Sequence, residues 1–173
     1  RWVARRRGEP LENSAANAPS VLSLQAINWY GGRGGHISFS PLLPFDGRRA
    51  LEQFLSNKSR YAEAGLDYNT TFGIAPRFLV NINMLLYDRD NTEQCARVTR
   101  LFATLVEDAR RRGYPEYRAH LDFMDVVAGT FDYGDHALRR LNERVKDALD
   151  PNGILAPGKQ GVWPRAWRDQ RGR

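Results

Sequence analysis

Cysteine and long apolar runs are scarce in this 173-residue sequence. The single cysteine, Cys95, excludes an internal disulfide and a cysteine-rich metal site. We therefore expect no metal centre and a reducing compartment, the cytoplasm. No run approaches the roughly 18 apolar residues of a membrane-spanning helix, and no signal-peptide pattern opens the chain. The sequence thus predicts a protein without a membrane partner.

Lysine is also rare, although the formal net charge is +6: only three of the 26 basic residues are Lys. Many of the arginines lie in two terminal clusters, at residues 1–7 and 165–173. Terminal clusters of this kind are typical of solvated tails, and no nucleic-acid-binding motif accompanies them. We expect no nucleic-acid partner.

The remaining composition is that of a globular domain, because a hydrophobic content of 42% is enough to form one core. The sequence starts at Arg1 rather than Met, so we expect a piece of a longer protein. Its patterning suggests three parts: a polar N-terminal segment (1–20), a main domain (21–132), and a C-terminal helix with a tail (133–173). Residues 20–30 are compatible with either a helix or a strand.

Alternation of side chains predicts three strands. In residues 36–41, Ile37 and Phe39 alternate with polar neighbours, so His36 falls on the polar face. Residues 66–74 and 78–87 follow as two adjacent strands, which favours an antiparallel pair.

Helical spacing predicts three helices, at 47–64, 91–112 and 135–149. Asp46, Asn91 with Gln94, and Asp135 are placed to cap their N-termini, and Gly65 and Gly113 to end the first two. The expected apolar stripes are Ala50, Leu51, Phe54, Leu55 and Tyr61 on the first helix, Val98, Leu101, Phe102, Leu105 and Val106 on the second, and Leu138, Leu141, Val145 and Leu149 on the third.

The order strand, helix, two strands, helix defines the fold class. It is typical of an α+β domain in which helices pack on one antiparallel sheet, here followed by a C-terminal helical segment.

Glu116-Tyr117-Arg118, shortly after Gly113 and Pro115, are the main candidates for chemistry. A guanidinium is charged at any working pH and a phenol is a good donor, so the pair Tyr117 and Arg118 can hold one anionic oxygen. A phenolate, an enolate and a carboxylate all fit. The alternative is an exposed Arg, a half-buried Tyr and a satisfied core His, and the spacing alone favours that alternative.

A second candidate is His36, which follows the glycine-rich run 31–35. Glycines without Cβ atoms allow the backbone to approach something flat and bulky. An ordinary loop before an edge strand, with a surface histidine, is the alternative.

The stretch from Asp150 to Pro164, DPNGILAPGKQGVWP, resembles the C-terminal signature of FAD-linked oxidases, and in its full form that of the vanillyl-alcohol oxidase and 4-cresol methylhydroxylase family. Three further stretches resemble the same family, in the same order along the chain. They are Gly34-Gly35-His36 with Phe39-Ser40-Pro41, Ala64-Gly65-Leu66-Asp67 with Thr71-Phe72, and Glu116-Tyr117-Arg118 with Leu121 and Met124-Asp125.

The resemblance implies the cap domain and C-terminal segment of a flavoenzyme, with a ferredoxin-like cap. It implies FAD, bound covalently through His36, with Gly35 and Lys159 near the cofactor. Tyr117 and Arg118 would hold the substrate as phenolate. Its benzylic carbon would then transfer hydride to FAD, which turns the substrate into a quinone methide. The cavity residues it implies are Ser38, Thr71, Ile82 and Glu116.

The resemblance also implies partners: a para-substituted phenol, an N-terminal FAD domain of the same chain, and further copies in a homo-oligomer. Ser38 stands where the best-known oxidase of the family has a bulky aromatic near the substrate, so a roomier cavity is expected. Two other functions stay open on the residues alone: an FAD-linked 2-hydroxy-acid oxidase or dehydrogenase, in which Arg118 would hold a carboxylate, and a non-catalytic α+β binding module.

Overall fold

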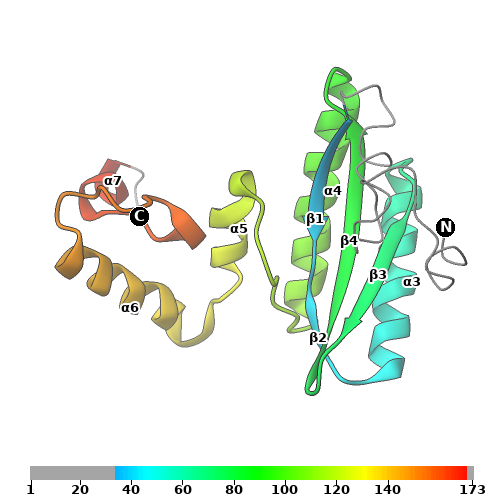
Figure 1. The fold of residues 1–173 in the computed structure, drawn as a ribbon, viewed down its shortest axis with the longest axis horizontal. Helices are drawn as coiled ribbons and strands as arrows, with labels where there is room; N and C mark the ends of the chain where they lie inside the picture. The colour runs from blue at the N-terminus through cyan, green and yellow to red at the C-terminus, as the bar shows by residue number, and fades with distance from the viewer. Residues whose placement is uncertain (1–33, 171–173) are drawn as a thin grey trace, which may run out of the picture.

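The computed structural model describes residues 34–170, so the expectations for residues 1–33 lie outside the described residues. Figure 1 shows a sheet with two long helices as one body, and the C-terminal helices as a second body joined to it through α5. The strands are β1 (Gly34–Phe39), β2 (Leu42–Pro44), β3 (Asn69–Ile74) and β4 (Phe78–Asp88). The helices are α3 (Gly47–Glu63), α4 (Thr92–Arg111), α5 (Met124–Gly129), α6 (Tyr133–Leu149) and α7 (Arg165–Gln170), with short 3-10 turns at Leu121–Phe123 (η2) and Lys159–Gly161 (η3).

The sheet is organised around β4. Strands β1 and β2 pair antiparallel with it in one continuous register, from Gly34 opposite Asp88 to Pro44 opposite Phe78. Strand β3 pairs antiparallel along the other edge of β4. A single bridge between Pro41 and Glu116 adds a short outer strand at residues 115–117. The order is therefore 115–117, β1 with β2, β4, β3, which is the split βαβ arrangement of a ferredoxin-like domain, and the predicted fold class is confirmed.

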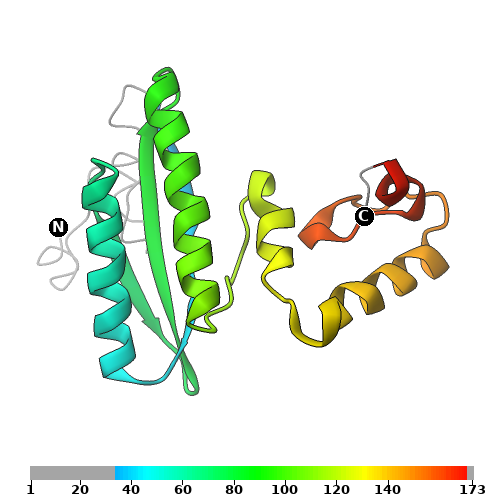
Figure 2. The same cartoon turned by 180° about the vertical axis from the view of Figure 1, so that it is seen from behind.

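Helices α3 and α4 cover one face of this sheet (Figure 2). Helix α4 buries the five residues predicted for its inner face, Val98, Leu101, Phe102, Leu105 and Val106. Phe102 contacts Phe39 edge to face, with ring centroids 6.1 Å apart, and stacks on Phe123 at 4.1 Å. These aromatic contacts tie α4 to β1 on one side and to η2 on the other, at about 0.5–1.5 kcal/mol each beyond burial.

Helix α3 differs from the prediction. Leu51 and Leu55 are 57% and 55% exposed, whereas Gln53 and Asn57, each 1% exposed, face the sheet together with Tyr61. The cause lies in β4, where Asn81 and Asn83 occupy the centre of the helix-facing side. Amides on the sheet require amides on the helix, because an unpaired buried polar group costs about 1–3 kcal/mol.

These amides form one connected network. Asn57 accepts from Gln53 Nε2 and donates to Asn81 Oδ1, both at 3.1 Å. Asn83 donates to the Phe39 carbonyl at 3.0 Å and accepts from the Thr70 hydroxyl at 2.8 Å. The network therefore joins α3 to β4, and β4 to the strands on both sides of it.

Most predicted helix ends are confirmed. Asp46 accepts from the backbone N–H groups of Arg48 and Arg49, and Asn91 accepts from that of Gln94. Gly65 and Gly113 end α3 and α4 with φ of +65° and +73°, a conformation that favours glycine.

Two predicted boundaries were wrong. Strand β3 begins at Asn69 rather than Leu66, because the Leu66 N–H still bonds to the Tyr61 carbonyl of the α3 terminus. Asp135 does not cap the last helix: α6 (Tyr133–Leu149) has left-handed φ values at residues 134–136, and the Asp135 side chain pairs with Arg140 at 2.9 Å. Within residues 34–170, no helix is long and apolar enough to cross a membrane.

Two substitutions on α3 test the buried amide network. Asn57→Ala leaves Gln53 and Asn81 without their shared partner, so we expect a loss of about 1–3 kcal/mol in the free energy of unfolding measured by urea denaturation. Leu55→Ala, two residues away on the exposed side, should change it by less than about 0.5 kcal/mol. A larger loss of unfolding free energy for Leu55→Ala than for Asn57→Ala would show that α3 is rotated relative to the sheet.

Candidate active site

The face of the sheet opposite α3 and α4 carries most of the predicted site residues. His36 lies opposite Leu86, and Ser38 lies opposite Met84 and donates to its sulfur at 3.2 Å. Thr71 lies opposite Ile82 in the next pair of strands. Because paired residues share a face and alternate residues along a strand share a face, His36, Ser38, Thr71 and Ile82 lie on one surface.

Tyr117 joins this surface through the short outer strand. The Tyr117 N–H donates to the Ser40 carbonyl at 3.0 Å, and the Leu42 N–H donates to the Pro115 carbonyl at 2.8 Å. With Pro41 opposite Glu116, this register sets Tyr117 opposite Ser40, on the face that also carries Ser38. Tyr117 is 54% exposed, and the Arg118 guanidinium lies 5.4 Å from the centre of its ring.

The result is one row of side chains across four strands, from Tyr117 through Ser40 and Ile82 to Thr71. At about 4.8 Å between neighbouring strands, the row spans roughly 14 Å. That length suits a single aromatic ring with a substituent, with a cation and a phenol hydroxyl at one end. His36 and Leu86 continue the same surface along β1 and β4.

Glu116 lies on the other side of the outer strand and is 9% exposed. Its Oε1 accepts from the Ser40 N–H at 2.7 Å, whereas its Oε2 is buried without a hydrogen-bond partner. Burial raises the pKa of Glu116 to about 8, against the opposing effect of the Ser40 and Arg118 N–H groups. At pH 7 this carboxyl group is therefore mainly neutral.

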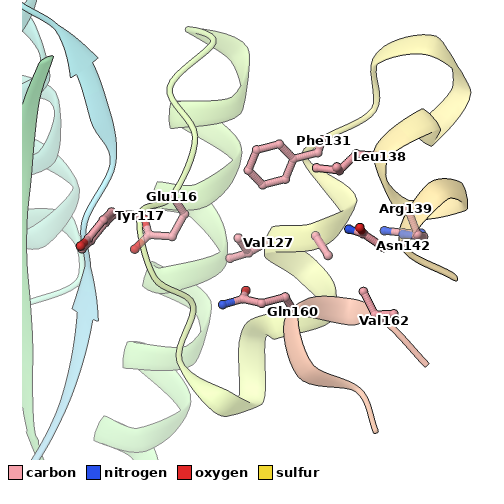
Figure 3. A pocket seen from close by; sticks show the side chains of 10 residues that line it. Glu116, Tyr117, Val127, Phe131, Leu138, Arg139, Asn142, Gln160 and Val162 are labelled. Carbon is pink, nitrogen blue, oxygen red and sulfur yellow. The ribbon is translucent and has the colours of Figure 1, made fainter. Parts of the chain in front are cut away.

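A cavity of about 210 Å³ adjoins Glu116 (Figure 3), where the carboxyl group points toward the β1–β2 edge. It lies between the sheet edge and the C-terminal body, and is lined by Glu116, Tyr117, Val127, Ala128, Phe131, Leu138, Arg139, Asn142, Gln160 and Val162. Apolar groups make up most of its wall, with Arg139 as its one charged side chain from α6.

The C-terminal signature begins as the predicted turn. The Gly153 N–H bonds to the Asp150 carbonyl at 3.0 Å, and the Asp150 carboxylate accepts from the N–H groups of Ile154 and Leu155, both at 2.9 Å. Lys146 pairs with the same carboxylate at 2.6 Å and is the main cause of the lowered pKa of Asp150. The turn therefore reverses the chain at the end of α6.

The signature then packs on α5. Gly161 has φ of +73°, and a Cβ on it would lie 2.4 Å from the Ala128 methyl group, so only glycine fits. Trp163 donates to the Asp125 carboxylate at 2.8 Å. The motif thus fixes α5, the helix that follows the Tyr117–Arg118 segment in sequence.

The remaining predicted residues fall elsewhere. Lys159 is exposed in η3 and lines a shallow hollow with Asp122 and Trp163. Gly35 faces the helix side, where a Cβ would lie 2.6 Å from the Tyr87 ring. Met84 and Leu86 lie on the same surface, opposite Ser38 and His36, and were not among the predicted residues although their alternation along β4 is visible in the sequence.

The sheet surface fits a flavin in its chemistry. His36 is exposed beside apolar Leu86, and among the described residues no partner hydrogen-bonds to its imidazole. A flat apolar surface next to an imidazole suits a planar ring system that carries a reactive position. Among residues 34–170, no group of three or more His, Cys, Asp or Glu side chains is arranged to hold a metal ion.

Comparison with known proteins gives the same assignment. Residues 80–160 match the family FAD linked oxidases, C-terminal domain. The chain is 35% identical over 147 residues to the 4-cresol dehydrogenase [hydroxylating] flavoprotein subunit of Pseudomonas putida. The matched residues make up 85% of this chain and 27% of that protein.

Two solved structures are similar as well. The 4-ethylphenol oxidase from Gulosibacter chungangensis, in complex with isoeugenol, has a TM-score of 0.81 and 36% identity over 84% of this chain and 28% of its own. The p-cresol methylhydroxylase with substrate bound has a TM-score of 0.73 and 34% identity over 81% and 27%. The chain thus spans about a quarter of the length of these relatives.

The fold and the sequence together define the C-terminal domain of an FAD-linked oxidase. Within that class, the chain is homologous to the C-terminal part of 4-cresol dehydrogenase and 4-ethylphenol oxidase, which confirms the resemblance noted in the sequence.

The buried Glu116 predicts a pH dependence of stability. Its pKa is raised from 4.5 to about 8 on folding, so between these values the native state binds more protons than the unfolded state, and the free energy of unfolding falls as pH rises. Glu116→Gln removes this slope. Between pH 5 and pH 9, the free energy of unfolding measured by urea denaturation should fall by on the order of 3–5 kcal/mol more in wild type than in the variant. Equal losses would show that the carboxyl group is not buried as a neutral acid.

Proposed function

We propose that this chain forms the substrate-binding side of a flavin-dependent oxidoreductase that oxidises para-substituted phenols, and that it works with an N-terminal FAD domain of the same protein. The observation that carries the proposal is the common surface of Tyr117, Ser38, Thr71, Ile82 and His36, with Arg118 at its edge. The relatives named for 4-cresol and 4-ethylphenol support the choice of substrate class.

Arg118 and Tyr117 hold the phenol oxygen. An unperturbed phenol has a pKa of about 10, and each unit of depression corresponds to about 1.4 kcal/mol in favour of the anion. The Arg118 guanidinium stays protonated and the Tyr117 hydroxyl donates, so both stabilise a phenolate. Both side chains are exposed on this chain, which leaves them accessible to substrate and to a covering domain.

The substrate ring lies over the apolar part of the surface, with its para carbon directed away from Arg118. Ile82 and Met84 supply apolar contact, and Thr71 closes the row at the β3 side. Ser38 is small, so the space beside Met84 admits a larger para substituent than a bulky aromatic would allow. We infer a preference for phenols with a substituent longer than methyl.

FAD, when bound, supplies the two-electron acceptor for hydride from the benzylic carbon. His36 is the residue of this chain proposed for covalent attachment, since its imidazole is exposed on the substrate-facing surface. Gly35 allows the close approach of β1 and Tyr87 that holds His36 in place, and Lys159 is assigned to the cofactor side by family resemblance alone.

The FAD domain is the proposed cover for a second apolar surface. Leu138, Leu141, Val145 and Leu149 of α6 are all exposed, and Ile154 and Leu155 of the signature extend them. Contiguous exposed apolar residues of this extent are typical of an interface. A homo-oligomeric state and a cytoplasmic location complete the proposal, on the grounds given by the family resemblance and the single cysteine.

Arg118→Ala tests the phenolate site in the full-length flavoprotein. Loss of a charge-assisted contact worth about 1.5–3 kcal/mol should weaken the binding of isoeugenol, followed by flavin absorption, by about 10- to 100-fold. Arg140→Ala is the matched control, because Arg140 is exposed and its partners within residues 34–170 are Asp135 and the Gly134 carbonyl. Unchanged binding by the Arg118 variant would exclude it from the site.

His36→Ala tests the flavin attachment. In wild type we expect flavin fluorescence to remain in the protein band after denaturing electrophoresis, and in the variant we expect that band to be dark. Retained fluorescence in the variant would move the attachment to another residue.

A further inference from the structure

The backbone ladder beside Tyr117 is incomplete. In a regular antiparallel pair, residues that exchange hydrogen bonds do so in both directions. Tyr117 donates to the Ser40 carbonyl, but the Ser40 N–H donates to Glu116 Oε1 at 2.7 Å instead of to the Tyr117 carbonyl. A carboxyl side chain thus takes the place of one ladder bond at the residue proposed to bind substrate.

The carboxyl group is buried and only half satisfied. Ser40 is itself 6% exposed, and Glu116 Oε2 has no partner. The other charged and titratable side chains that line the same cavity are Tyr117 of its own segment and Arg139 of α6, and no ion pair within residues 34–170 involves Glu116. A neutral acid suits this environment, because an isolated buried carboxylate is strongly disfavoured.

We propose that Glu116 is a positioning residue for the phenolate site: its neutral carboxyl group holds segment 115–118 against Ser40 and so sets the places of Tyr117 and Arg118. What binds there rests on the function proposed above. Glu116 itself touches neither substrate nor cofactor in this assignment, because it lies on the other side of the strand from Tyr117.

Ionisation of Glu116 disturbs the site because a charge in this buried place draws the segment toward water. That movement loosens Tyr117 and Arg118. Since burial raises the pKa of Glu116 to about 8, substrate capture should decline as pH rises through 8.

The test is the pH profile of kcat/KM for p-cresol in the full-length holoenzyme, from pH 6.5 to 9.5. The substrate does not interfere, because a phenol titrates near pH 10. The kcat/KM of wild type should fall at least fivefold between pH 7 and pH 9. Glu116→Gln keeps an acceptor for the Ser40 N–H and cannot ionise, so it should stay within about threefold of wild type at pH 7 and show no decline.

Two further variants complete the experiment. Glu116→Ala leaves the Ser40 N–H unpaired and should lower kcat/KM by about 10- to 100-fold at pH 7. Glu52→Gln makes the same substitution at an exposed acid of α3 and should keep the wild-type profile. Superimposable profiles of wild type and Glu116→Gln would overturn the proposal, as would a Gln variant as impaired as the Ala variant.

A failure of the proposed function would look different. If neither p-cresol nor 4-ethylphenol reduces the flavin of wild type at any pH, the phenol-oxidising function is wrong, and Glu116 is then judged by amide hydrogen exchange. Residues 40–42 and 115–118 of wild type and of Glu116→Gln should exchange alike at pH 6.5, and faster in wild type at pH 9.5. Equal exchange at both pH values would overturn the positioning role.

Discussion

The antiparallel pairing along β4 is the constraint on which the site depends. Its continuous register with β1 and β2 sets His36, Ser38 and Ser40 in line, and the single bridge from Pro41 to Glu116 adds Tyr117 to that line. A shift of one residue in either register would turn every one of these side chains to the other face. The surface proposed to bind substrate is therefore a property of strand pairing more than of any loop.

The sheet has an unusual division of polarity. Its helix-covered side holds Asn81 and Asn83 at the centre, whereas the side away from α3 and α4 presents Val80, Ile82, Met84 and Leu86. Amides buried under a helix fix one arrangement of α3, because each must find its partner. Apolar residues on the other side are what a substrate and a covering domain require, which is consistent with a chain that spans a quarter of its relatives.

The sequence predicted β1, β3 and β4, the α4 core face and the helix-ending glycines, because period and propensity act locally there. It did not predict β2 or the outer strand at residues 115–117. It suggested Tyr117, Arg118 and His36 from residue chemistry, and Ser38, Thr71 and Ile82 through family resemblance, and the register sets Tyr117, His36, Ser38, Thr71 and Ile82 on one surface. On α3 it predicted the buried Tyr61 but missed Gln53 and Asn57, since apolar Leu51 and Leu55 outweigh amides in any periodicity argument. The roles of Asn57 and Glu116 depend on partners 24 and 76 residues away, which no local pattern contains.

The most direct test of the account is anaerobic addition of substrate to the full-length protein, with the visible flavin absorption as readout. We predict that p-cresol bleaches a bound flavin and that lactate, a 2-hydroxy acid, does not. Bleaching by lactate and not by p-cresol would assign Arg118 to a carboxylate. A full-length protein without bound flavin would contradict the account as a whole.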